Sequence, residues 1–225
     1  MKFSHPRRDA PKEISEPALG SVVAATRCGI VRCEDRRPTI AIGDPPRPPG
    51  LARFFERVVR QALGDLRLGG PTEGAYLAAL LTRFARADEL YAIRDAAGRP
   101  LDSVAGLLIE AERAWDFQAP DFDPFRERRV RQHVGDYALF MTGLFREHVE
   151  RRAGAAYYIR QGQRAYQAVA DFERSALRPE ARLFAALAAG FERYAAALAY
   201  LKRVYFRPGD APAPLQPMLR LLTQW

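Results

Sequence analysis

The sequence predicts an all-α protein, a single helical bundle of about six or seven helices around a central buried helix. Three observations predict this class. Apolar residues recur at helical spacing from residue 51 to residue 206, strand-like segments do not alternate with helical ones, and one segment is free of charge through its middle. The motifs G-x-G-x-x-G and G-x-x-x-x-G-K-[ST] are absent from the sequence, so Rossmann and P-loop folds are excluded.

Residues 130–152 form the predicted central helix. The stretch between Asp136 and Arg146 contains no charged residue, whereas an ordinary surface helix has one charged face. Gly135 and Gly143 each cost a helix interior about 1 kcal/mol relative to alanine. We expect close approach of neighbouring helices to offset that cost. The alternative is a helix break at Gly135, which would give two shorter helices.

Apolar stripes predict the other helices, and proline or glycine marks the breaks between them. The expected ranges are Leu51–Leu66, Thr72–Tyr91, Val104–Trp115, Ala155–Ala176 and Pro179–Phe206. Thr72 should cap the second of these helices, and Asp102 or Ser103 the third. The central helix should have Pro124 in its first turn and end at Gly154.

The two ends of the chain differ from the expected bundle, residues 51–207. Residues 1–50 form a Pro-rich extension that closes with PPRPPG, and two β-like runs within it could pair as a small hairpin. Residues 208–225 combine a linker with a short helix, Leu215–Trp225. A helix of that length is not stable alone, so we expect it to dock on the body or on a second copy.

Composition restricts the location and the partners. The sequence has no apolar run of about 18 residues and no signal-like apolar segment at its N-terminus, so we expect a soluble cytoplasmic protein without a membrane partner. The net charge of +8 invites a nucleic-acid partner. However, the arginines are spread along the chain among acidic residues, and only Lys2, Lys12 and Lys202 are lysines, a bias typical of GC-rich genomes. We therefore do not expect nucleic-acid binding.

Cys28 and Cys33 do not form a metal motif, because a structural zinc site needs four ligands. Two reduced thiols are expected, with a local disulfide as the alternative. No E-x-x-H pair precedes His133 or His148, which excludes the di-iron motif of helical bundles, and no G-x-S-x-G nucleophile motif is present. No catalytic residue, metal ligand or cofactor site is therefore assigned.

His133 and Asp136 form the pair most suggestive of chemistry. They lie three residues apart, so on a helix Asp136 could accept a hydrogen bond from the imidazole and fix its tautomer. If the other ring nitrogen faced a cavity, His133 could act as a general base or metal ligand. The interpretation we favour is structural: a buried histidine satisfied by its own helix, with Asp136 bonded to an arginine. Tyr137 lies on the same side.

Tyr158, Gly162 and Tyr166 align on the fifth helix at i, i+4 and i+8. Two tyrosines on either side of a glycine leave a notch that another helix or a flat ligand could fill. We expect these tyrosines to pack in the core with their hydroxyl groups hydrogen-bonded. A pocket between the central and fifth helices would be lined by His133, Asp136, Tyr137, Tyr158 and Tyr166.

Residues 133–145, HVGDYALFMTGLF, and 157–166, YYIRQGQRAY, resemble a group of uncharacterised bacterial helical proteins. That group has a GD-x-ALF-x-x-G-x-F segment followed by YY-x-x-x-G-x-x-AY. The resemblance covers only the central and fifth helices and excludes the Pro-rich extension. It implies a helical fold and assigns no activity to any residue.

The absence of a complete catalytic set from the sequence favours a non-enzymatic helical interaction or scaffold protein that self-associates, as a homo-oligomer or with a protein partner. The alternative is an enzyme or small-molecule binder with a pocket between the central and fifth helices, around His133 and Asp136.

Overall fold

The computed structural model of the chain describes residues 49–116, 118 and 122–206. By its contacts the chain divides into residues 1–43 and 44–225, and every described helix belongs to the second unit. The predicted hairpin, the two cysteines and the predicted helix Leu215–Trp225 lie outside the described residues.

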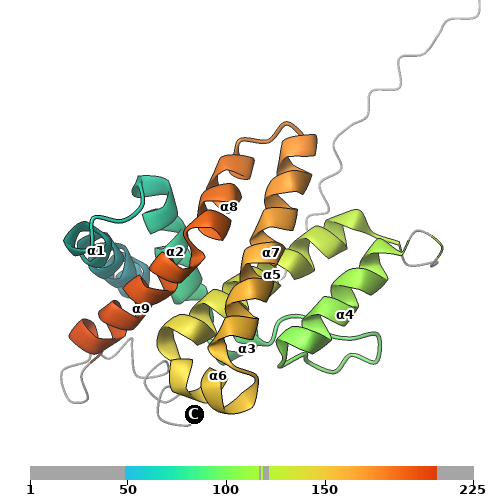
Figure 1. The fold of residues 1–225 in the computed structure, drawn as a ribbon, viewed down its shortest axis with the longest axis horizontal. Coiled ribbons are helices and arrows are strands. Elements are labelled where there is room, and N and C mark those ends of the chain that lie inside the picture. Colours follow the sequence, from blue (N-terminus) through green and yellow to red (C-terminus); the bar gives the residue numbers. More distant parts are fainter. Residues whose placement is uncertain (1–48, 117, 119–121, 207–225) are drawn as a thin grey trace, which may run out of the picture. The chain divides into compact units, whose positions relative to one another are not determined.

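The described residues form an all-α bundle, as the sequence predicts (Figure 1). Their nine helices are α1 (Pro49–Asp65), α2 (Pro71–Phe84), α3 (Ala87–Leu90), α4 (Val104–Trp115), α5 (Pro124–Leu144), α6 (Arg146–Arg152), α7 (Ala155–Ser175), α8 (Glu180–Ala189) and α9 (Phe191–Tyr205). Within the same residues the only extended pairing is an isolated bridge between Arg94 and Pro100. None of the described helices has the length and apolar character needed to cross a membrane.

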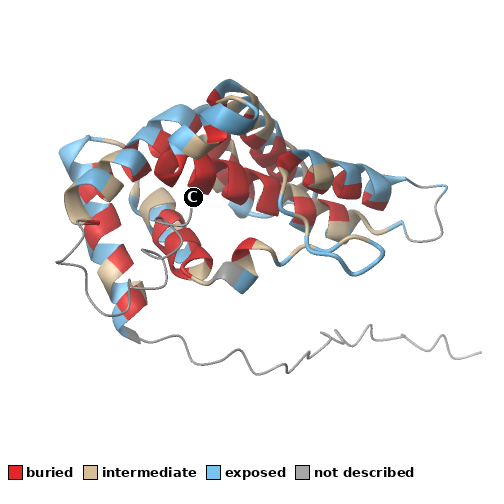
Figure 2. Cartoon of the chain, turned by 90° about the horizontal axis from the view of Figure 1, so that it is seen from below, coloured by how far each residue is buried: buried red, intermediate tan, exposed pale blue. Residues whose placement is uncertain are grey.

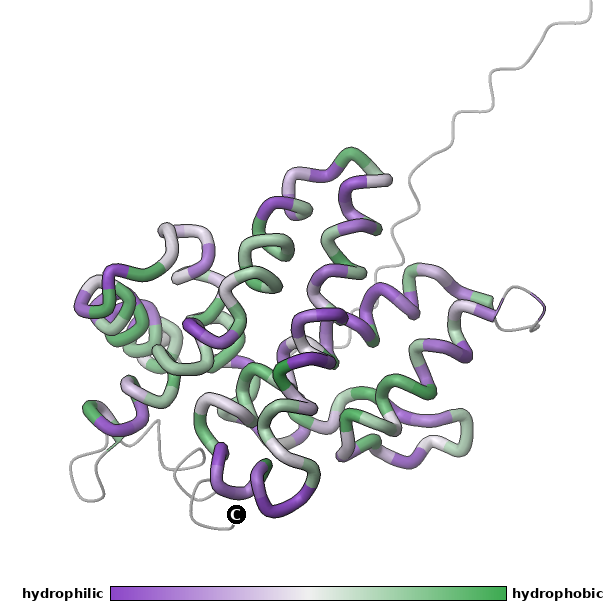
Figure 3. Tube along the Cα trace, in the orientation of Figure 1, coloured by the Kyte–Doolittle hydropathy of each residue, from purple (hydrophilic) through white to green (hydrophobic). Residues whose placement is uncertain are grey.

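Helix α5 is the predicted central helix. Every residue from 133 to 145 is buried, and α4, α7 and α9 all pack against α5. Figure 2 shows this buried stretch as a nearly continuous red ribbon. Peripheral helices such as α1 alternate between hydrophobic and hydrophilic residues instead (Figure 3). That alternation gives each of them one apolar face to turn inward.

Glycines allow the helices around α5 to approach closely. A Cβ atom on Gly135 would come within 2.6 Å of the Tyr166 ring on α7, and one on Gly143 within 2.6 Å of Leu198 Cβ on α9. A Cβ on Gly162 of α7 would overlap the ring of Phe191. The expected role of the two α5 glycines is therefore confirmed, and α5 runs through Gly135 without a break.

The central helix is shorter than predicted, because it ends at Leu144 and α6 begins separately at Arg146. Phe145 interrupts it with φ −125° and ψ 35°. Its side chain is buried and its ring lies 5.5 Å from that of Phe140. The Lys202 ammonium donates a hydrogen bond to the Leu144 carbonyl oxygen (2.5 Å), which satisfies an acceptor at the end of α5.

The long helix predicted over Pro179–Phe206 is likewise two helices, α8 and α9, which meet at Gly190. A Cβ on Gly190 would come within 2.7 Å of the Tyr194 ring, so the glycine permits a bend that brings the aromatic ring against the backbone. The apolar stripe continues across the bend, which is why periodicity alone does not reveal it.

The helix predicted over Thr72–Tyr91 divides into α2 and α3. Its N-cap is Gly70, with Pro71 in the first turn, so the expectation that Thr72 caps it is wrong. The other capping predictions are confirmed. The Ser103 hydroxyl accepts a hydrogen bond from the Gly106 amide (3.2 Å), and Pro124 opens α5.

Candidate functional site

Asp136 is the centre of a buried polar cluster that joins three helices. Only 1% of the residue is exposed. Its Oδ1 accepts hydrogen bonds from the Tyr76 hydroxyl of α2 (2.6 Å) and the Tyr166 hydroxyl of α7 (2.8 Å). Its Oδ2 accepts one from Arg83 Nη2 of α2 (2.6 Å). Both carboxylate oxygens are thus engaged by protein donors, as a buried charge requires.

The cluster continues along one face of α5 through residues four apart. Gln132 Nε2 donates to the Tyr76 hydroxyl (3.0 Å), and Arg128 Nη1 donates to Gln132 Oε1 (2.5 Å). Arg128 Nε donates to Glu173 Oε1 on α7 (2.7 Å), and Glu173 is itself almost fully buried. We call the set the Asp136 network; its members are Tyr76, Arg83, Arg128, Gln132, Asp136, Tyr166 and Glu173.

The surroundings of the two tyrosines of the network keep their hydroxyl groups protonated. Burial first, and the Asp136 charge second, raise the pKa of Tyr76 and Tyr166 well above the usual value, so both remain neutral donors. Burial lowers the pKa of Arg83, but the attraction of Asp136 outweighs it and the pKa is raised overall. The Nε atom of Arg83 is buried without a hydrogen-bond partner, the single such side-chain atom among the described residues.

His133 is a neighbour of Asp136 on α5, but its ring bonds to the backbone of α3 instead. Its exposed fraction is 8%, and its Nε2 lies 3.1 Å from the carbonyl oxygen of Leu90. A carbonyl can only accept, so this contact requires the tautomer with a proton on Nε2. The ring also packs edge-on against Phe84. Burial lowers the pKa of His133, and the nearby Asp136 charge offsets this only in part.

Tyr137 and Tyr158 form a second aromatic contact between α5 and α7, with ring centroids 6.4 Å apart in a stacked arrangement. The Tyr137 hydroxyl donates to the Asp102 carbonyl oxygen (2.8 Å), and burial raises the pKa of this tyrosine. Of the five residues proposed from the sequence, only Asp136 and Tyr166 bond to each other directly. His133 points to α3, and Tyr137 to the segment before α4.

The sequence reasoning missed the other five members of the network, Tyr76, Arg83, Arg128, Gln132 and Glu173. A signal for two of them exists: Arg128, Gln132 and Asp136 recur every four residues on the central helix, which places them on one face. Nothing local indicates that Tyr76 and Arg83 of α2 meet this face.

The polar groups at the centre of the bundle are occupied by one another or by the backbone. Asp136 has no free oxygen to act as a base, and the His133 Nε2 proton is held by a backbone carbonyl. In the part of the chain that the structure describes, no group of three or more His, Cys, Asp or Glu side chains is placed to hold a metal ion.

The fold and the cluster together define an all-α protein with a buried, charge-paired centre. The chain matches no protein-family model, and no curated protein or solved structure is significantly similar to it. The resemblance of residues 133–166 to bacterial helical proteins therefore stays a prediction.

Proposed function

We propose that the protein is a non-enzymatic helical protein that acts by binding a second copy of itself. The observation that carries this proposal is a group of exposed aromatic side chains at the junction of α4 and α5. Large apolar side chains that gather on a surface are typical of protein interfaces, whereas single exposed ones are common on any protein.

What we call the aromatic surface consists of two pairs of rings, Trp115 with Phe122 and Phe125 with the half-buried Phe172. The first three have exposed fractions of 55%, 43% and 56%. The rings of Trp115 and Phe122 lie 6.1 Å apart, and Phe125 meets Phe172 of α7 edge-on at 5.7 Å. A hydrogen bond from the Asp123 amide to the Ala114 carbonyl oxygen (3.0 Å) holds the end of α4 beside the start of α5.

The charges around the aromatic surface support a second copy as the partner. Asp116 and Asp123 are close in sequence to its rings, and Asp123 forms an exposed ion pair with Arg129 (3.7 Å; 43% and 62% of the two side chains exposed) that could exchange partners with a second copy. In a twofold interface each surface meets its own rotated copy, so mixed charges can pair across the axis. A surface of one sign would repel its own copy and would favour an oppositely charged partner instead.

The alternative, an enzyme or small-molecule binder around His133 and Asp136, has less support. The described side chains at that place bond to one another or to the backbone, which leaves few polar groups to receive a substrate. Catalytic and binding sites ordinarily keep a few polar groups directed into a pocket.

Light scattering of the full chain tests the proposal. The wild-type protein should show a mass above the 25.3 kDa of one chain, and a Trp115→Ser/Phe125→Ser double variant should shift toward that mass. Leu177→Ser is the matched control, because Leu177 is 93% exposed but lies at the turn between α7 and α8. Its mass should stay that of the wild type.

A wild-type chain that remains monomeric at a concentration of about 100 µM would contradict the proposal. Even a small specific interface should hold two copies together at that concentration. Native mass spectrometry of the same sample distinguishes the alternative: retention of an organic molecule that is lost in a His133→Gln variant would favour the binder.

A further inference from the structure

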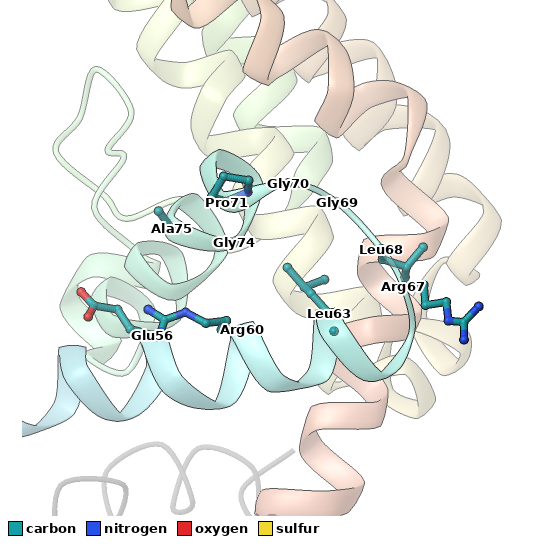
Figure 4. Close-up of a pocket in the computed structure, with 11 residues that line it drawn as sticks. Glu56, Arg60, Leu63, Arg67, Leu68, Gly69, Gly70, Pro71, Gly74 and Ala75 are labelled. Atoms are coloured by element: carbon teal, nitrogen blue, oxygen red, sulfur yellow. The ribbon is translucent and has the colours of Figure 1, made fainter.

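A pocket of about 480 Å³ lies between α1 and α2, and no member of the Asp136 network lines it. It is bordered by Glu56, Arg60, Leu63 and Gly64 of α1 and by Gly74 and Ala75 of α2, with the connecting turn closing one end (Figure 4). Its volume falls within the range of about 300–1,000 Å³ that is usual for small-molecule sites.

The pocket is hollow because glycines form part of its wall. A Cβ atom on Gly64 would meet no atom within 4 Å, and one on Gly74 would only touch Leu63 Cδ1 at 3.4 Å. These two glycines therefore face open space, unlike Gly135 and Gly162, whose missing side chains are replaced by aromatic rings.

The turn between the two helices gives the pocket a preformed end wall. The Leu68 amide donates to the Leu63 carbonyl oxygen (2.9 Å) and the Arg67 amide to that of Gly64 (3.1 Å), the two bonds of a Schellman motif. Arg67 occupies the left-handed region at φ 51°, where glycine is usual, and Gly69 follows at φ 65°. Two residues in this region fix the path of the turn.

Apolar side chains line the inner part of the pocket. Leu63 is buried in the core, and Leu68 is partly buried against the same core. Ala75 and Pro71 add further apolar surface. A ligand that fills this part of the pocket needs an apolar body, because it would replace water in contact with hydrocarbon.

Two side chains of opposite charge on α1 lie at the opening of the pocket. Glu56 and Arg60 are four residues apart on the same helix, yet within the described part of the chain no ion pair joins them or engages either side chain. Figure 4 shows both side chains along the α1 side of the mouth, whereas Arg67 extends away from the pocket. Arg60 is therefore the guanidinium placed to receive a ligand group.

The first turn of α2 does not supply the binding group. Glu73 already caps it, because its Oε2 accepts a hydrogen bond from the Gly70 amide (2.9 Å). The polar selectivity of the pocket is thus set by Arg60, which attracts an anion, and by Glu56, which repels a second negative charge. The net charge of +8 also raises the local concentration of anions.

We propose that this pocket binds small amphipathic monocarboxylates, with the hydrocarbon chain against Leu63 and Leu68 and the carboxylate on Arg60. Arginine suits this partner because its planar guanidinium can donate two parallel hydrogen bonds to one carboxylate.

Titration calorimetry of the full chain with octanoate, octylamine and octan-1-ol tests the charge preference. Octanoate should bind tighter than either of the other two, and its affinity should fall as salt is added. Arg60→Gln should weaken octanoate binding by about five- to tenfold, as expected for loss of one charged hydrogen-bond donor. Glu56→Gln should strengthen it by about two- to threefold, because a like charge is removed.

A pair of glycine variants tests the location. Gly64 lines the pocket and a Cβ atom there meets no atom within 4 Å, and leucine is a good helix former, so Gly64→Leu should fold, fill part of the pocket and bind no octanoate. Gly50→Leu is the matched control: it lies in the same helix, its Cβ also meets open space, and it does not line the pocket. It should bind as the wild type does.

Three results would each overturn the proposal. The first is tighter binding of octylamine than of octanoate, and the second is unchanged octanoate binding in Gly64→Leu. The third is no detectable octanoate binding at concentrations up to about 5 mM, which exceeds the dissociation constant expected for a specific small ligand. The oligomeric mass is a separate measurement, so none of these results depends on the proposed self-association.

Discussion

Among the residues that the structure describes, charged side chains are buried and paired in the Asp136 network, whereas they are exposed and unpaired at the α1–α2 pocket. Asp136 is enclosed and receives three hydrogen bonds from two other helices. Glu56 and Arg60 lie on one helix beside open space and engage no partner among the described residues. A charge can be buried only where the surrounding helices complete its hydrogen bonds, and such a charge is then unavailable to a ligand. Unpaired charges at a cavity remain available for binding.

Glycines show the same contrast. Those of α5 and α7 are sites where a ring or another helix occupies the space of the missing side chain, whereas those of α1 and α2 leave that space empty. Identical residues thus tighten the core in one region and open a pocket in the other. Three pairs of substitutions test how far this comparison holds.

Removal of the central carboxylate should have the largest effect. Asp136→Ala leaves the Tyr76 and Tyr166 hydroxyls and the Arg83 guanidinium without their acceptor, so we expect a loss of about 3 kcal/mol in the free energy of unfolding. Urea denaturation followed by circular dichroism measures it. Asp171→Ala, which breaks an exposed ion pair with Arg174, should change stability by at most about 0.5 kcal/mol. Equal losses in the two variants would contradict the comparison.

Alanine at two glycines should act in opposite directions. Gly162→Ala forces a methyl group against the Phe191 ring, and we expect a loss of about 2 kcal/mol despite the better helix propensity of alanine. Gly64→Ala faces open space and should stabilise the protein by about 0.5–1 kcal/mol. Midpoints of urea denaturation report both. A stabilised Gly162→Ala variant would show that α7 and α9 are not packed as described.

The smallest effect expected is the pH dependence that His133 contributes. Burial holds the pKa of His133 below its ordinary value of about 6.5, so the folded protein favours the neutral ring. The contribution of His133 to the free energy of unfolding is therefore fully present above about pH 6.5. It falls as the pH drops below that value, because the unfolded chain binds the proton more readily. Between pH 7.5 and 5.5 the wild type should therefore lose stability through this residue.

Urea denaturation at both pH values measures this loss, with His133→Gln as the variant that should lack it. His148→Gln replaces a histidine that is only half-buried and should retain most of the wild-type pH dependence. If the free energy of unfolding changes with pH equally in His133→Gln and in the wild type, His133 is not the source of that change.

The candidate site was only partly visible in the sequence. Asp136 and Tyr166 were selected from helical spacing, and the structure brings them into contact. Their partner Tyr76 was not selected, because an apolar stripe does not distinguish a tyrosine that packs from one that donates a hydrogen bond. Apart from the glycines of the turn, the sequence does not indicate the α1–α2 pocket, because a void depends on which side chains surround it.

The breaks between helices show a similar limit. Ser103 and Pro124 mark helix starts through local chemistry, and both were found. Phe145 and Gly190 interrupt helices within continuous apolar stripes, and both were missed. The break at Phe145 is satisfied by Lys202, a residue far along the chain, and local sequence carries no information about such a partner.

The amino-acid sequence by itself determined the all-α class, the buried central helix and the role of its glycines, because helical periodicity and steric size act between neighbours along the chain. Only the tertiary structure decided which donors reach Asp136, where the helices break, and where space remains between α1 and α2. Those features depend on how separate helices rotate and cross, and a hydrogen bond or a void formed between two helices has no counterpart in the spacing of residues along either one.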